Sequence, residues 1–313
     1  MSFPICPLHS VVSHNRSAAE AQMQAHLASW LHEADFAAMK RDGFNSVRLP
    51  LGYWNLLEDP FDRFVPQSVG LSLYYIDWVF EMCAKYALTV LLDLHGAPGS
   101  QNGIDHSGCD MEPEWLESPA NMNLTLSAIE VMMKRYGNRP ALAGIELVNE
   151  PSVRYCQPAM VPTLLDFYHR AYTVVRKYSP GTMVVFNELY AECYAVWKDK
   201  LLEPSYHNVV MDLHLYNWQL PYTPEPVEEH IADAVAFAEV IEEQAAHHPV
   251  LVGEWCFSTG TVVQAGQPFV DACVESFRSS LGWYLWNWKV ERGIHFDEWD
   301  VQLQYETKDG LRV

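Results

Sequence analysis

Seven short apolar runs, each preceded by an amphipathic stretch of helical period, are the feature that most limits how this chain can fold. Nearly continuous runs of Val, Ile and Leu are typical of parallel strands that are covered on both faces. Strands that alternate regularly with helices predict an α/β architecture. The predicted strands span residues 45–50, 88–94, 142–148, 183–187, 208–213, 249–254 and 282–288. The predicted helices span residues 18–42, 71–87, 121–136, 162–178, 191–202, 226–246 and 267–280.

Seven such units with no linker between them favour a (β/α)8 barrel that occupies residues 1–313 as a single domain. A doubly wound sheet would instead carry a glycine-rich nucleotide loop after its first strand, and the sequence has none there. The missing eighth strand, first in order, has to precede residue 18, where only "PICPLHSVV" is available. Because Pro4 and Pro7 cannot donate to a sheet ladder, we predict that this first strand is missing or irregular. We further expect the natural chain to be longer at this end, and this 313-residue chain to be poorly soluble or weakly active.

Charge and composition exclude several classes of partner. A net charge of −20 repels a phosphate backbone, so we expect no nucleic-acid partner and a neutral or cationic ligand. The sequence contains no apolar run of about 18 residues, which predicts no membrane span. The seven Cys form no C-x-x-C pair, which argues against a zinc knuckle or a disulfide framework. "MSFPICPLHSVV" lacks the features of a secretory signal, and neither the compartment nor the oligomeric state follows from the sequence.

Polar and aromatic side chains stand at the ends of the predicted strands, and in a barrel these ends surround the active face. Charged carboxylates are almost never fully buried without a partner, so Glu150 and Glu254 at the ends of two apolar strands need a functional reason. Two carboxylates that face one cavity supply an acid and a base or nucleophile, which is the pair that glycoside hydrolysis requires. The strand-end residues are Arg48, His95, Asn149, Glu150, Asn187, Glu188, His214, Tyr216, Glu254, Trp255 and Trp286.

Six segments along the chain are similar to one enzyme family. "GFNSVRLPLGYW", "DLHGAPGSQNGIDHSG", "GIELVNEP", "DLHLY", "VGEW" and "WYLWNWKVE" resemble glycoside hydrolase family 5, most closely its exo-β-1,3-glucanase branch. The resemblance runs in order from about residue 33 to residue 305. It implies a retaining hydrolase of β-glucosidic bonds that acts on a β-glucan oligosaccharide or β-glucoside and needs no metal or other cofactor. It also implies an extracellular or cell-wall location.

The same resemblance assigns roles to the strand-end residues. Glu150 matches the general acid/base and Glu254 matches the nucleophile, which Arg48 and His214 would steady and which Tyr216 would neighbour. The remaining matches are sugar contacts: Asn149 for the 2-hydroxyl, His95 for the wall of the −1 pocket and Trp286 for its floor.

The sequence departs from the exo-β-1,3-glucanase branch around the pocket. Ile104 and His106 replace an aromatic clamp and an amide, and Gln219 replaces a second aromatic residue for which Trp218 could substitute. These changes leave open the β-1,3 preference and the exo mode, so that another β-glucoside linkage or a glucolipid is an alternative substrate.

Two other readings remain. A metal enzyme is suggested by "DLH" at residues 93–95 and 212–214, but the sequence has neither H-x-H nor H-E-x-x-H. A catalytically impaired carbohydrate-binding barrel is suggested by the missing first strand and opposed by the presence of both glutamates.

Overall fold

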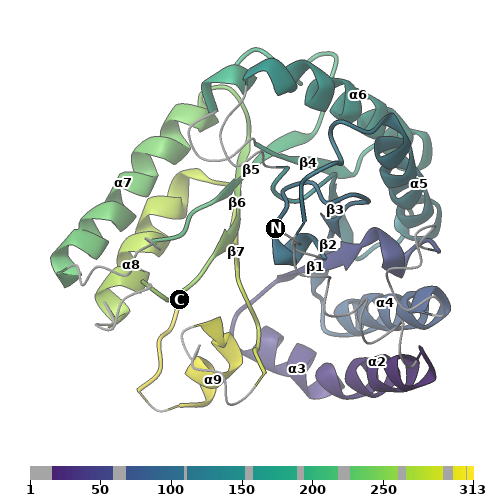
Figure 1. Ribbon diagram of the computed structural model, residues 1–313. Coiled ribbons are helices and arrows are strands. Elements are labelled where there is room, and N and C mark those ends of the chain that lie inside the picture. Colours follow the sequence, from purple (N-terminus) through teal and green to yellow (C-terminus); the bar gives the residue numbers. More distant parts are fainter. Residues whose placement is uncertain are drawn as a thin grey trace. The chain divides into compact units, whose positions relative to one another are not determined.

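The computed structural model describes residues 16–58, 68–108, 111–151, 158–188, 194–217, 226–259, 266–291, 299–307 and 309–313 (Figure 1). By its internal contacts the chain divides into two compact units, Met1–Trp197 and Lys198–Val313.

The first unit contains four parallel strands that are paired in the order of the chain. In the register of the first pair, Arg48 lies opposite Leu91. Helices α5 and α6 pack against each other and lie side by side in Figure 1. The strands are β1 (Ser46–Gly52), β2 (Thr89–Gly96), β3 (Leu142–Glu146) and β4 (Met183–Asn187). The helices are α2 (Arg16–Trp30), α3 (Glu33–Arg41), α4 (Ser68–Lys85), α5 (Pro119–Tyr136) and α6 (Val161–Tyr178). Short 3-10 turns lie at Tyr53–Asn55, Asp105–Ser107, Pro158–Met160 and Tyr194–Trp197.

Local sequence signals account for α5, the helix that follows the loop after β2. Ser118 caps α5 by accepting a hydrogen bond from the backbone N–H of Asn121, at 3.2 Å. Pro119 occupies the first helical position, where a missing N–H costs nothing. Lys134 and Arg135 lie in the last turn, where positive charge is favourable.

The second unit contains three parallel strands, β5 (Val209–His214), β6 (Val250–Trp255) and β7 (Trp283–Leu285), also paired in the order of the chain. Helix α7 (Val227–Ala245) packs on α8 (Gly266–Ser276). Helix α9 (Val301–Glu306) begins at Asp300, whose side chain accepts from the backbone N–H of Leu303 at 2.8 Å. A further 3-10 turn spans Phe277–Ser279.

All seven predicted strands are present, each after a helix or helical turn, which confirms the predicted α/β alternation. The predicted eighth strand falls at residues 3–12, outside the described residues. The prediction that residues 1–313 form one domain stays a prediction.

Two predicted helices and one predicted strand were wrong in extent. The helix predicted at 18–42 is two helices, because the Asp35 carboxylate accepts from the backbone N–H of His32 at 2.7 Å and starts a new helix there. In the described part of 191–202 only the 3-10 turn at Tyr194–Trp197 is helical. The buried Trp197 ring of that turn packs on Tyr168 and Phe186 at 5.7 and 5.4 Å. The last strand covers three residues of the predicted 282–288.

The described cysteines are buried thiols. Cys83 lies in the first unit, and Cys256 and Cys273 lie in the second. Burial raises the pKa of Cys83 to about 12 and raises that of Cys273 further. None of the helices within the described ranges is both long and apolar enough to cross a bilayer.

Candidate active site

The Arg48 side chain links the first three strands. It leaves β1 with only 4% of its surface exposed and donates from Nε to Oε2 of Glu146 on β3 at 2.9 Å. Its Nη2 lies 3.1 Å from Oδ2 of Asp93 on β2. Both carboxylates are fully buried, which is tolerated because each is paired with the guanidinium.

Asn149 is fully buried just beyond β3 and is held by the same arginine. Its Oδ1 accepts from Nη2 of Arg48 at 2.7 Å, and its backbone N–H donates to the carbonyl of Leu94 at 3.0 Å. Among the described residues, Nδ2 of Asn149 has no hydrogen-bond partner. Because a buried donor without a partner costs free energy, this amide is suited to a ligand oxygen.

Glu150 follows directly and adopts a left-handed backbone conformation, with φ of +40°. Non-glycine residues rarely adopt this conformation unless the surroundings impose it, and such strain is concentrated at functional sites. Two amides of the loop after β2 supply the restraint. Gln101 donates to the carbonyl of Asn149 at 3.0 Å, and Asn102 donates to the carbonyl of Glu150 at 3.2 Å. The carboxylate of Glu150 lies 3.4 Å from Nε2 of His106.

His95 is buried at the end of β2, where the apolar strand turns into its glycine-rich loop. Its Nδ1 bonds Oδ2 of Asp93 at 2.7 Å, and its carbonyl accepts from Gln101 at 2.7 Å. Since an ionised carboxylate accepts only, Nδ1 carries the proton in this pair. Through Gln101, the loop of glycine and polar residues therefore holds both His95 and the segment that follows β3.

In the second unit, Glu254 is the centre of a set of polar side chains. It lies on β6 with 5% of its surface exposed and accepts from the Tyr216 hydroxyl at 2.7 Å. Nδ1 of His214 lies 3.6 Å from its Oε2. The hydrogen bond that Glu254 accepts from the Tyr216 hydroxyl favours the ionised carboxylate.

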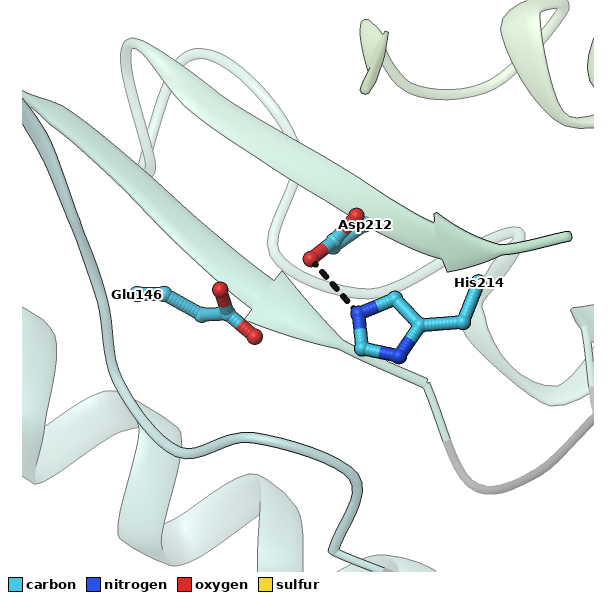
Figure 2. Close-up of side chains that lie close together, drawn as sticks. All are labelled: Glu146, Asp212 and His214. Atoms are coloured by element: carbon cyan, nitrogen blue, oxygen red, sulfur yellow. Dashed lines mark hydrogen bonds and ion pairs between the residues drawn. The ribbon is translucent and has the colours of Figure 1, made fainter. Parts of the chain in front are cut away.

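A buried carboxylate on the same strand as His214 positions that imidazole. Asp212 lies 3.3 Å from Nε2 of His214, as the dashed line in Figure 2 shows, and also accepts from the backbone N–H of Gly253 at 2.6 Å. A Cβ atom at Gly253 would lie 2.1 Å from the Asp212 carboxylate, so only glycine fits beside it. Figure 2 also draws Glu146, the last residue of β3.

The other predicted strand-end residues also lie where strands end. Asn187 is the last residue of β4 and Glu188 follows it, both buried, and Trp255 is fully buried at the end of β6. Trp286 follows β7, is half-buried, and donates its backbone N–H to the carbonyl of Trp255 at 2.8 Å.

Sequence reasoning missed Glu146 and considered Asp93 and Asp212 only as parts of a possible metal site; all three are fully buried within the strands. The signal was present, because each interrupts an apolar run ("LLDLH", "GIELV", "VMDLH") and a buried charge needs a partner. It also missed Gln101 and Asn102, whose roles depend on the fold of one loop and have no sequence pattern of their own.

Residues 13–292 match the model of a protein family that is described as Cellulase (glycosyl hydrolase family 5). The chain belongs to this family. It is therefore an O-glycosyl hydrolase of the retaining type, as the resemblance implied.

The sequences of curated relatives can be aligned with almost the whole of this chain. Glucan 1,3-beta-glucosidase of Pichia angusta is 28% identical, over 96% of this chain and 77% of that protein. The protein of the same name from Schwanniomyces occidentalis is also 28% identical, over 96% of this chain and 77% of its own length.

Solved structures share the fold. A rutinosidase from Aspergillus niger superposes with a TM-score of 0.70 at 19% identity, over 82% of this chain and 74% of that one. Endoglucanase Cel5A from Thermotoga maritima superposes with a TM-score of 0.59 at 16% identity, over 82% of each chain. The likeness confirms the predicted (β/α)8 barrel class.

Proposed function

We propose that this family 5 hydrolase cleaves β-glucosidic bonds of β-glucan oligosaccharides in the manner of a glucan exo-1,3-β-glucosidase. The names of its curated relatives support a β-1,3-glucan substrate. The substrate would be neutral, which is compatible with a chain that carries a net charge of −20. In this proposal residues 1–313 act as one catalytic domain.

One observation carries the assignment of the nucleophile. Glu254 is a buried carboxylate that accepts a hydrogen bond from the Tyr216 hydroxyl at 2.7 Å, and this donor holds it in place and favours its ionised form. Its oxygen attacks the anomeric carbon while the bond from that carbon to the leaving oxygen breaks. The product of this step is a covalent glycosyl-enzyme.

Glu150 is proposed as the general acid and base. It gives its proton to the leaving oxygen in the first step, and as a carboxylate it takes a proton from the water that attacks the glycosyl-enzyme in the second. The water oxygen then becomes the new anomeric hydroxyl, and Glu254 leaves as a carboxylate. A retaining pair of this kind works at a separation of about 5–5.5 Å.

The surrounding residues take the sugar-binding roles. Nδ2 of Asn149, which lacks a hydrogen-bond partner among the described residues, is proposed to donate to the sugar 2-hydroxyl. Arg48 holds that amide by its Oδ1 and is proposed to steady the nucleophile as well. His95 is proposed to line the −1 pocket, and Trp286 is proposed to form its floor.

The stereochemistry of the product tests the mechanism. Proton NMR of the first-formed sugar from an aryl β-glucoside should show the β-anomer. Glu254→Ala should not form the glycosyl-enzyme at all, whereas Glu150→Ala should form it from an activated substrate and be rescued by azide as the β-glycosyl azide. An initial α-anomer, or azide rescue of the Glu254 variant in place of the Glu150 variant, would refute these assignments.

A substrate panel tests the linkage. Laminari-oligosaccharides should be hydrolysed from one end with release of glucose, faster than cello-oligosaccharides or glucosylated lipids. The loop position Ile104, 40% exposed, offers an aliphatic side chain where the exo-β-1,3-glucanase branch carries an aromatic ring. A preference for glucosylated lipids or for another linkage would contradict the proposed β-1,3 specificity, while the proposed roles of the catalytic residues would be unaffected.

A further inference from the structure

The loop after β2 places a second titratable group against Glu150. Nε2 of His106 lies 3.4 Å from Oε2 of Glu150, and the two side chains are 28% and 18% exposed. His106 lies in the 3-10 turn Asp105–Ser107, and its ring meets the ring of His95 edge to face at 5.6 Å. The imidazole is therefore supported on one side by a buried residue and directed at the proposed acid/base on the other.

Asn102 determines which nitrogen of His106 can carry a proton. Its Oδ1 accepts from the backbone N–H of Ile104 at 3.0 Å, so the oxygen end of the amide is fixed. Its Nδ2 then faces both the carbonyl of Glu150 at 3.2 Å and Nε2 of His106 at 3.0 Å. Because an amide nitrogen only donates, Nε2 has to accept, and the proton of the neutral imidazole is on Nδ1.

An imidazole in this tautomer discriminates between the two forms of Glu150. An ionised carboxylate would present lone pairs to the lone pair of Nε2, which is unfavourable at 3.4 Å. A protonated carboxyl can direct its O–H toward the same nitrogen. The separation is longer than an ordinary O–H···N hydrogen bond, so the proton is held loosely enough to pass to a leaving oxygen.

We propose that His106, fixed by Asn102, is a positioning residue that orients Glu150 and keeps its proton available for the leaving group. This inference rests on the proposed role of Glu150 as the general acid. It gives a function to a histidine at a position where the exo-β-1,3-glucanase branch has an amide.

Leaving-group dependence tests the inference, because an activated leaving group departs without a proton. The substrates are 2,4-dinitrophenyl β-glucoside, which needs no acid, and phenyl β-glucoside, which does. His106→Phe keeps a ring of similar size and removes the nitrogen. It should lower kcat/KM for the phenyl substrate about 10- to 100-fold and change the dinitrophenyl value less than about threefold, since general acid catalysis contributes ~10²–10⁴.

Two further variants separate positioning from folding. His106→Gln can place an amide oxygen near the position of Nε2 and should restore most of the phenyl activity. Asn102→Asp replaces the donor by an acceptor, which favours a proton on Nε2, and should show the same selective loss as His106→Phe. The control is Asp105→Asn, an exposed neighbour in the same turn that should behave as wild type with both substrates. Equal losses with both substrates, or no loss in His106→Phe, would overturn the inference.

A variant of Glu150 itself separates a failure of the proposed role of Glu150 from a failure of the inference on His106. Glu150→Gln should show the selective loss at full size, and adding His106→Phe should then change the ratio of the two rates no further. If Glu150→Gln retains phenyl β-glucoside hydrolysis, the proposed role of Glu150 fails. If Glu150→Gln behaves as expected and His106→Phe does not, the inference on His106 fails alone.

Discussion

Arg48 is the cation that compensates the buried carboxylates of Asp93 and Glu146 in the first unit. It pairs with Glu146 and Asp93, and all three side chains are at most 4% exposed. We predict that Arg48→Met lowers the free energy of unfolding by about 3–5 kcal/mol, because it leaves two carboxylates buried without their cation. Urea unfolding followed by circular dichroism measures the change.

The matched control breaks an ion pair at the surface. Lys85→Met removes the cation that pairs with Glu33, and both of these side chains are at least half exposed. It should leave the urea midpoint close to that of the wild type, because exposed pairs contribute little. Equal midpoints for the two variants would contradict the importance given to the buried network.

Asn149→Ala should affect turnover more than affinity. The contact of its amide with the sugar 2-hydroxyl is expected to strengthen in the transition state, so kcat should fall by about 10-fold or more while KM changes little. Steady-state kinetics with an aryl β-glucoside measure both. A change confined to KM would show that the amide contributes equally to ground-state binding.

Gly253 has no room for a side chain. We predict that Gly253→Ala costs about 1–3 kcal/mol, because the added methyl group would lie 2.1 Å from the Asp212 carboxylate that orients His214. Thermal unfolding and kcat should both report the displacement. Gly181→Ala is the control, because a Cβ there meets nothing within 4 Å, and its melting temperature should stay near that of the wild type.

For individual residues, the sequence predicted which side chains follow the strands, but it did not predict the buried ion pairs that hold them. Glu150 and Glu254 follow from the rule that a charge at the end of an apolar strand needs a reason. The same rule applies to Asp93 and Glu146, but their partner Arg48 lies 98 residues from Glu146, and no local pattern links them. Pairings of this length become visible only when the strands are placed side by side.

Among the elements, α4 and α5 are joined by a bidentate ion pair. Arg135 donates from Nε to Asp77 at 3.0 Å and from Nη2 to the other carboxylate oxygen. These hydrogen bonds with Arg135 hold the pKa of Asp77 below its ordinary value. Since the folded pKa is the lower one, the stabilisation is present above about pH 4, the ordinary Asp pKa, and is lost as the pH falls toward the folded pKa.

We therefore predict that Asp77→Asn lowers the free energy of unfolding at pH 7 by about 1 kcal/mol or less, because the pair is partly exposed and screened by solvent. The difference from the wild type should shrink as the pH is lowered from 5 to 3. Urea unfolding at several pH values measures it. A difference that grows toward acid pH would show that the carboxylate is not stabilised by Arg135.

The elements themselves were largely predictable because hydrophobic periodicity determines them. Strands β2, β4 and β6 begin and end within two residues of the predicted bounds. The break between α2 and α3 was not predicted, since it depends on one capping hydrogen bond between Asp35 and the backbone of His32. Hydrophobic periodicity alone does not reveal a single hydrogen bond of this kind.

For the whole molecule we predict one cooperative unfolding transition, as expected if residues 1–313 form a single domain. Far-UV circular dichroism, tryptophan fluorescence and calorimetry should give coincident midpoints and equal calorimetric and van't Hoff enthalpies. Two separated transitions would assign independent stability to the units Met1–Trp197 and Lys198–Val313.

The barrel class could be predicted because its signal is spread over seven repeated units, so that errors at single boundaries do not alter it. The first strand could not be assigned from sequence, because a strand containing two prolines has neither alternation nor a complete set of donors. The exposed Ile104 shows a related limit: a barrel face determines where a substrate binds, while individual loop residues determine which substrate it is.

Two of the buried thiols, Cys83 in the first unit and Cys273 in the second, can each report how often the structure around them opens. Only a thiolate reacts with an alkylating reagent, and a buried thiol of raised pKa is protected until the structure around it opens. Mass spectrometry of peptides after timed alkylation would therefore give a separate protection factor for each unit under conditions in which the enzyme is fully folded. Equal protection factors would indicate that the two thiols are exposed by the same opening event, and unequal ones would identify the unit that opens more readily.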